Sequence, residues 1–96
     1  MEKNDQLFMQ LLYMFHTSAM QGLGKIADPT GKISRNLEYA SETIDLMEML
    51  KDKTKGNISM DIEKVLNEML SELRLNYIEE KANPGEKKVK EKLANE

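Results

Sequence analysis

The sequence predicts an all-α fold: a short bundle of three helices, in which a helical hairpin follows an apolar N-terminal helix and dimerisation completes the core. Three observations predict it. Apolar residues in the long segments recur at the three- and four-residue spacing of an amphipathic helix. Alternating runs of β-branched and aromatic residues, which would indicate strands, are absent from the sequence. Glycine and proline lie between the long segments, where turns are expected.

The first helix is expected from about Asp5 to Leu23. Asn4 or Asp5 can accept hydrogen bonds from the free backbone N–H groups of the first turn. Gly24 can adopt the left-handed conformation that ends a helix. The run Asp28-Pro29-Thr30-Gly31 then predicts a turn, because proline presets φ and glycine allows a positive φ.

The second helix is expected from about Leu37 to Lys55, with Asn36 or Ser34 as its N-cap and Gly56 at its end. Its apolar residues form one broad face that we expect to be buried. This face consists of Leu37, Tyr39, Ala40, Ile44, Leu46, Met47 and Leu50.

The third helix is expected to begin after Ser59, a good N-cap, and to run to about Glu80. Its predicted buried face consists of Ile62, Val65, Leu66, Met69, Leu70, Leu73 and Tyr77. Residues 1–80 are thus predicted to form a single helical domain. The segment 81–96 is rich in lysine and glutamate and is predicted to be a solvated, disordered tail.

The first helix differs from the other two because it is apolar nearly all round. Between Asp5 and Lys25 the sequence contains no charged side chain. A helix of this kind must be buried on nearly every side, and two amphipathic neighbours cover only part of it. A second copy of the chain can cover the rest in a two-fold contact, so we predict a homodimer or a higher even oligomer. The predicted self-association surface is Met9, Tyr13, His16 and Met20.

The composition restricts the function classes. The 96 residues carry a net charge of −3, which argues against a nucleic-acid partner. The absence of cysteine removes disulfides and thiolate chemistry, and a single histidine leaves little for metal binding or general-base catalysis. The apolar stretch from Leu7 to Met20 is too short for a membrane span, and the N-terminus lacks the basic region of a secretory signal. We therefore expect a cytoplasmic, non-enzymatic protein with no cofactor, no bound metal and no catalytic residue.

Three features could suggest chemistry, and each has a plainer structural interpretation. Gly24 and the segment Thr30-Gly31-Lys32 resemble a phosphate loop, but their spacing is wrong and they follow a helix rather than a strand. His16 is interpreted as a packed or interface histidine, with assembly linked to its protonation as the sharper alternative. The acidic face of the second helix is interpreted as a solvated face rather than a cation site. This face consists of Glu38, Glu42, Asp45 and Glu48.

Several short runs between Leu7 and Tyr77 match a known family. They are Thr17-Ser18-Ala19-Met20, Leu23-Gly24, Asp28-Pro29-Thr30-Gly31, Asn36-Leu37-Glu38-Tyr39-Ala40, Thr43-Ile44-Asp45, Met49-Leu50, Lys53-Thr54-Lys55-Gly56-Asn57-Ile58 and Leu73-Arg74 with Tyr77. With these runs the chain resembles a small bacterial family known as domain of unknown function 1844. The chain has Ser59-Met60 where the family often has Thr-Pro, a departure that preserves the helix cap. The resemblance implies a short helical cytoplasmic protein and supplies no activity, substrate or catalytic residue.

The leading functional hypothesis is a self-associating protein-interaction module, which could also contact a second protein. The alternative is a helical groove that binds an apolar small ligand or lipid through Met9, Tyr13 and Met20. The two hypotheses differ in whether the apolar surface of the first helix is covered by another copy or stays open.

Overall fold

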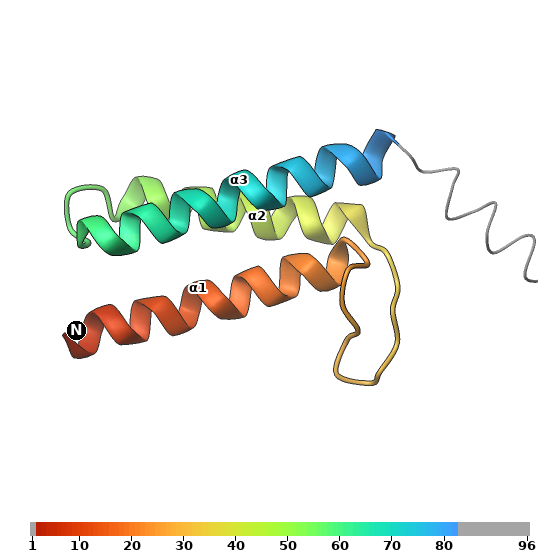
Figure 1. The fold of residues 1–96 in the computed structure, drawn as a ribbon, viewed down its shortest axis with the longest axis horizontal. Helices are drawn as coiled ribbons and strands as arrows, with labels where there is room; N and C mark the ends of the chain where they lie inside the picture. Colours follow the sequence, from red (N-terminus) through yellow and green to blue (C-terminus); the bar gives the residue numbers. More distant parts are fainter. Residues whose placement is uncertain (1, 83–96) are drawn as a thin grey trace, which may run out of the picture.

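The computed structural model describes residues 2–82 and confirms the all-α prediction. Three helices pack together in this part of the chain, and none of its residues forms a strand (Figure 1). The helices are α1 (Lys3–Gly22), α2 (Leu37–Lys53) and α3 (Met60–Ala82).

The start of α1 differs from the prediction. The N-cap is Glu2, in an extended conformation and without a side-chain hydrogen bond to the helix. Asn4 and Asp5 lie inside the first turn, so the prediction that one of them caps the helix is wrong. Asp5 still stabilises the N-terminal end of α1, because an acidic side chain in the first turn interacts favourably with the helix dipole.

The end of α1 follows the prediction. Gly24 has a φ of 76°, in the left-handed region that glycine adopts without steric cost. Its N–H donates to the carbonyl oxygen of Gln21 (3.0 Å), and the N–H of Lys25 donates to that of Met20 (2.9 Å). These two bonds form a Schellman motif, which satisfies carbonyl groups that the helix end leaves free.

Local caps also set the limits of α2. The side chain of Asn36 accepts a hydrogen bond from the backbone N–H of Tyr39 (3.0 Å), as expected of an N-cap. The helix ends at Lys53 rather than at Lys55. Gly56, with a φ of 79°, turns the chain after that end.

The beginning of α3 is capped by Ser59, as predicted. Its hydroxyl accepts a hydrogen bond from the backbone N–H of Ile62 (3.3 Å). The helix continues to Ala82, beyond the expected end at Glu80. The rest of the predicted tail, residues 83–96, lies outside the described residues.

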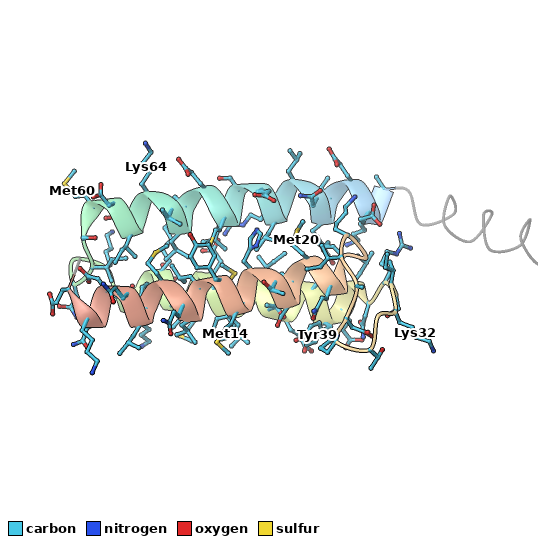
Figure 2. All side chains as sticks on the ribbon, turned by 60° about the horizontal axis from the view of Figure 1, so that its bottom comes forward. Met14, Met20, Lys32, Tyr39, Met60 and Lys64 are labelled. Atoms are coloured by element: carbon cyan, nitrogen blue, oxygen red, sulfur yellow. The ribbon has the colours of Figure 1, made fainter. Side chains whose placement is uncertain are left out.

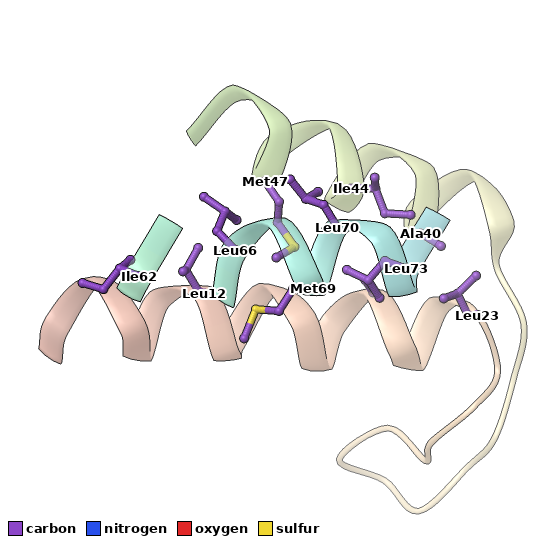
Figure 3. Close-up of a cluster of buried hydrophobic side chains, with 11 residues drawn as sticks. Leu12, Leu23, Ala40, Ile44, Met47, Ile62, Leu66, Met69, Leu70 and Leu73 are labelled. Atoms are coloured by element: carbon purple, nitrogen blue, oxygen red, sulfur yellow. The ribbon is translucent and has the colours of Figure 1, made fainter. Parts of the chain in front are cut away.

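The core runs along the inside of all three helices (Figure 3). Its buried members are Leu12, Ala19, Leu23, Ala40, Ile44, Met47, Ile62, Leu66, Met69, Leu70 and Leu73. All five α3 residues in this set were predicted to be buried, and Val65 and Tyr77 pack against the set at its edge. The helical periodicity of α3 therefore identified its buried face correctly.

The buried face of α2 is narrower than predicted. Tyr39 and Leu46, both assigned to that face, are each 45% exposed, so this part of the prediction is wrong. Thr43 is buried instead, and its hydroxyl donates a hydrogen bond to the carbonyl oxygen of Tyr39 (2.9 Å). Because this bond satisfies the hydroxyl, a polar residue can occupy a core position that the apolar pattern did not indicate.

Ionic contacts tie the α1–α2 connection to the end of α3. The Glu80 carboxylate lies 3.3 Å from Lys25 Nζ and 3.4 Å from Arg35 Nη1. Arg35 Nη1 also donates to the backbone carbonyl oxygen of Glu80 (3.1 Å). These contacts join residues far apart in the sequence and hold the connection at the same end of the bundle as the C-terminal turn of α3 (Figure 1).

Candidate self-association surface

The apolar circumference of α1 is only partly covered by α2 and α3. Leu12, Ala19 and Gly22 are buried, and residues on either side of them pack against the core. Three apolar side chains of α1 remain largely in solvent. They are Leu7 (49% exposed), Tyr13 (55%) and Met14 (66%).

The structure does not present the four residues of the predicted self-association surface as one exposed patch. Met9 and Met20 are partly buried and pack against the core, and Figure 2 shows Met20 between α1 and α3. His16 Nε2 lies 3.7 Å from a carboxylate oxygen of Glu72 on α3. Of the four, Tyr13 alone is mostly in solvent. Self-association through this set stays a prediction.

The side of α3 that borders these residues carries three glutamates around the exposed Leu75. Glu72, the neighbour of His16, has Glu68 four residues before it and Glu79 seven residues after it. Residues at these spacings share one side of a helix. Two copies that met through this side would bring like charges together, which opposes association.

A second exposed apolar surface lies on the other side of α1, where it borders α2. We call it the α1–α2 face and define it by Leu7, Leu11, Met14, Tyr39, Leu46 and Leu50. Leu11 and Leu50 are half-buried, and the other four are exposed. In Figure 2, Met14 and Tyr39 lie on the same edge of the bundle, and Met60 and Lys64 of α3 lie on the opposite edge.

Close packing of α1 on α2 keeps the two halves of this face together. A Cβ atom placed on Gly22 would lie 3.1 Å from the backbone N and Cβ of Ala40 and 3.1 Å from Cδ2 of Tyr39. A side chain at this point would crowd Ala40 and Tyr39, and glycine lets the two helix backbones approach without that crowding. The contact also places Tyr39 at the edge of α2 that faces α1, and Leu46, seven residues later, follows on the same edge.

In the loop that resembled a phosphate site, hydrogen-bond donors of the loop bond to the loop's own aspartate. The Asp28 carboxylate accepts hydrogen bonds from the Thr30 hydroxyl (2.5 Å), the Thr30 N–H (2.9 Å) and the Lys32 N–H (3.1 Å). The Thr30 hydroxyl, followed by the Lys32 N–H, holds the pKa of the Asp28 carboxyl below its usual value. A negative side chain thus occupies the donors that a phosphate would use, which favours the interpretation of a simple turn.

The acidic face of α2 is mostly solvated, as expected. Glu38, Glu42 and Asp45 are exposed, and Glu48 forms an ion pair with Arg74 of α3. In the part of the chain that the structure describes, no group of His, Asp and Glu side chains is arranged to hold a metal ion. In the same part, none of the helices is both long and apolar enough to cross a membrane.

Comparison with known proteins places the chain in a family. Residues 5–79 match the family model described as Domain of unknown function (DUF1844), and the chain belongs to this family. The matched region includes the α1–α2 face, so that surface is part of the family domain. Neither the curated proteins nor the solved structures give a match.

Proposed function

We propose that this DUF1844 domain acts through protein–protein contact and associates with itself through the α1–α2 face. One observation carries the proposal: Leu7, Met14, Tyr39 and Leu46 from two packed helices are exposed on one side of the bundle. Covering such side chains is favourable, since full burial of a large apolar side chain contributes about 1.5–3 kcal/mol. A small domain with a limited core gains much from such burial.

The charge of α1 favours a second copy as the partner. A two-fold interface brings the same surface of both copies together, so charged groups near the axis approach their own symmetry mates. The sequence from Gln6 to Gly24 carries no charged side chain. The exposed part of α1 after Asp5 therefore contributes no like-charge repulsion when it meets another copy.

A groove that binds an apolar ligand is supported less well. The residues expected to line it were Met9, Tyr13 and Met20, and two of these already pack against the core. An open groove would require both methionines to leave that packing. We therefore favour protein contact, and the proposal assigns the domain no catalytic role.

The solution mass of the full chain tests the proposal. We expect a wild-type dimer by light scattering and a monomer for Met14→Glu, which places a charge in the α1–α2 face. Met60→Glu is the matched control, because Met60 is 85% exposed on the opposite edge of the bundle (Figure 2). This variant should keep the wild-type mass, and circular dichroism should show that both variants remain helical. A wild-type monomer at every accessible concentration would overturn the proposal.

A further inference from the structure

The α1–α2 face follows a seven-residue repeat on both helices. On α1 the apolar positions of the repeat are Leu7, Leu11 and Met14, and the same spacing continues through the polar residues Ser18 and Gln21. On α2 the apolar positions are Tyr39, Leu46 and Leu50, and the same spacing includes Thr43 and Lys53, which are polar. Both series alternate steps of four and three residues, the spacing of helices that pack along their length against a nearly parallel or antiparallel partner. Packing within one chain accounts for only some of the positions in the two rows.

Exposure alternates along the apolar part of both rows, and Gln21 at the end of the α1 row is half-buried. Leu11 and Leu50 are half-buried and Thr43 is buried, so one set of positions serves the contact between α1 and α2. The alternate set, represented by Met14 and Leu46, is exposed. Each helix therefore has a row of positions turned out of its own bundle at the spacing that another helix requires.

We infer that two copies pair through this face with α1 against α1 and α2 against α2, each pair antiparallel, about a two-fold axis at the level of Met14 and Leu46. The inference rests on the proposed self-association and adds its geometry. The four helices then form a central antiparallel bundle, and α3 of each copy covers the outer side.

The register between α1 and α2 allows one axis to cross both helices. Gly22 lies opposite Ala40, and the two helices run in opposite directions from that contact. Met14 lies about 12 Å from Gly22 along α1 at 1.5 Å per residue, and Leu46 lies about 9 Å from Ala40 along α2. Met14 and Leu46 are thus within about one helical turn of the same level. They are also the middle residues of their rows.

Charges on α2 favour the pairing of α2 with itself. Glu38 and Glu42 lie near the start of the exposed side of the helix, and Lys53 lies at its end. Antiparallel pairing about Leu46 brings the acidic end of each copy to the basic end of the other, whereas parallel pairing brings like charges together. Pairing α2 with α1 instead would leave these charges opposite the part of α1 after Asp5, which carries no charged side chain.

Disulfide trapping in the full chain tests this geometry, because the wild-type sequence has no cysteine. Leu46→Cys lies at the proposed axis and should form a disulfide-linked dimer under mild oxidation, because its two copies face each other. Tyr39→Cys and Lys53→Cys each lie seven residues from Leu46, on opposite sides. Neither should crosslink alone, but an equimolar mixture should give the linked heterodimer. Met60→Cys, on the opposite edge of the bundle, should remain unlinked.

Charge exchange gives a second, non-covalent test. Glu38→Lys and Lys53→Glu should each raise the dissociation constant about two- to tenfold at low salt, and the double variant should recover the wild-type value. The two residues are about 22 Å apart along one helix, so such recovery requires contact between copies. A double variant as weak as the single variants would contradict the antiparallel α2 pair.

The outcomes separate this geometry from the proposed function. A dimer in which Leu46→Cys stays unlinked, while a mixture of Met14→Cys and Leu46→Cys chains crosslinks, would show α1 packed on α2 of the other copy. That result would overturn the geometry and leave self-association intact. A monomeric wild-type chain would overturn both.

Discussion

The two sides of α1 differ in what surrounds their apolar residues. Where α1 borders α3, Met9 and Met20 pack against the core, and the neighbouring side of α3 carries Glu68, Glu72 and Glu79. Where α1 borders α2, the adjoining residues Tyr39 and Leu46 are themselves apolar and exposed. Apolar residues alone therefore do not define an interaction surface. The charge and exposure of the neighbouring helix decide which side is suited to a second copy.

Between these two sides, α1 has a buried inner strip that contains Leu12. Leu12 lies on the inner side of α1 with no exposed surface, and its neighbour Tyr13 is more than half exposed. Stability of the folded domain should depend on the inner strip, and association should depend on an outer side. Substitutions along α1 can separate the two.

The largest expected effect comes from removing the inner strip. Leu12→Ala should destabilise the domain by about 2–5 kcal/mol, because the truncation loses apolar burial and leaves a cavity among all three helices. Urea unfolding at a fixed protein concentration measures this change in the free energy of unfolding. Tyr13→Ala, at a 55% exposed position outside the α1–α2 face, is the control and should cost less than about 1 kcal/mol. Equal losses for the two variants would mean that the inner and outer sides of α1 are not distinct.

A smaller effect is expected where α1 approaches α2. Alanine normally stabilises a helix interior relative to glycine by about 0.5–1 kcal/mol. Gly22→Ala should instead destabilise by about 1–3 kcal/mol, because the added methyl group crowds the Ala40 backbone and overpacks the contact. Thr17→Ala, on the exposed side of the same helix, should be neutral or slightly stabilising. Thermal unfolding of the two variants gives the comparison, and a stabilised Gly22→Ala domain would argue against the close approach.

Adjacent residues on α1 distinguish its two outer sides directly. Tyr13 and Met14 are both exposed, so glutamate at either position should change the stability of the monomer by less than about 0.5 kcal/mol. Met14→Glu should raise the dimer dissociation constant at least about tenfold, which corresponds to about 1.4 kcal/mol. Tyr13→Glu should leave it nearly unchanged. Sedimentation equilibrium measures both constants, and the reverse result would assign association to the side that includes Met9, Tyr13, His16 and Met20.

The smallest effect concerns the loop that joins the two helices of the α1–α2 face. The Thr30 hydroxyl and the Lys32 N–H donate hydrogen bonds to the charged form of the Asp28 carboxyl and hold its pKa below the usual value in the folded protein. An aspartate whose pKa is lowered by folding contributes stability above its unfolded pKa, and the contribution is lost as the pH falls through the folded pKa. The amide resonances of Thr30 and Lys32 should therefore shift below about pH 3.8. Asp28→Asn should abolish that shift. The resonances of Tyr13 and Met14 should stay unchanged over the same pH range, both in the wild-type protein and in the variant.

Much of the local structure could be predicted because it depends on neighbouring residues. Gly24 and Gly56 take positive φ angles beyond α1 and α2, and Asn36 and Ser59 cap the next helices. The exception is the start of α1, where Glu2 precedes the helix without a side-chain cap. Several good first-turn residues follow one another there, and the sequence does not distinguish a cap from a first-turn position.

Contacts between distant residues could not be predicted. Arg35 and Glu80 are 45 residues apart and join only when the connection folds back on α3. His16 has no acidic residue within a turn of its own helix, and its acidic neighbour Glu72 comes from α3. No pattern in the sequence relates these positions, because local spacing carries no information about which helices become neighbours.

The sequence by itself determined three helices, most of their caps and the buried face of α3. Each of these follows from hydrogen bonds or apolar spacing within a few turns of chain. Only the tertiary structure decided which side of α1 is buried. It also decided which residues of α2 stay exposed next to the uncovered side of α1. The reason is physical: a helix that is apolar nearly all round has no preferred side of its own. The side that packs is selected by where α2 and α3 dock, and Gly22 permits the approach of α2 that leaves Met14, Tyr39 and Leu46 in solvent.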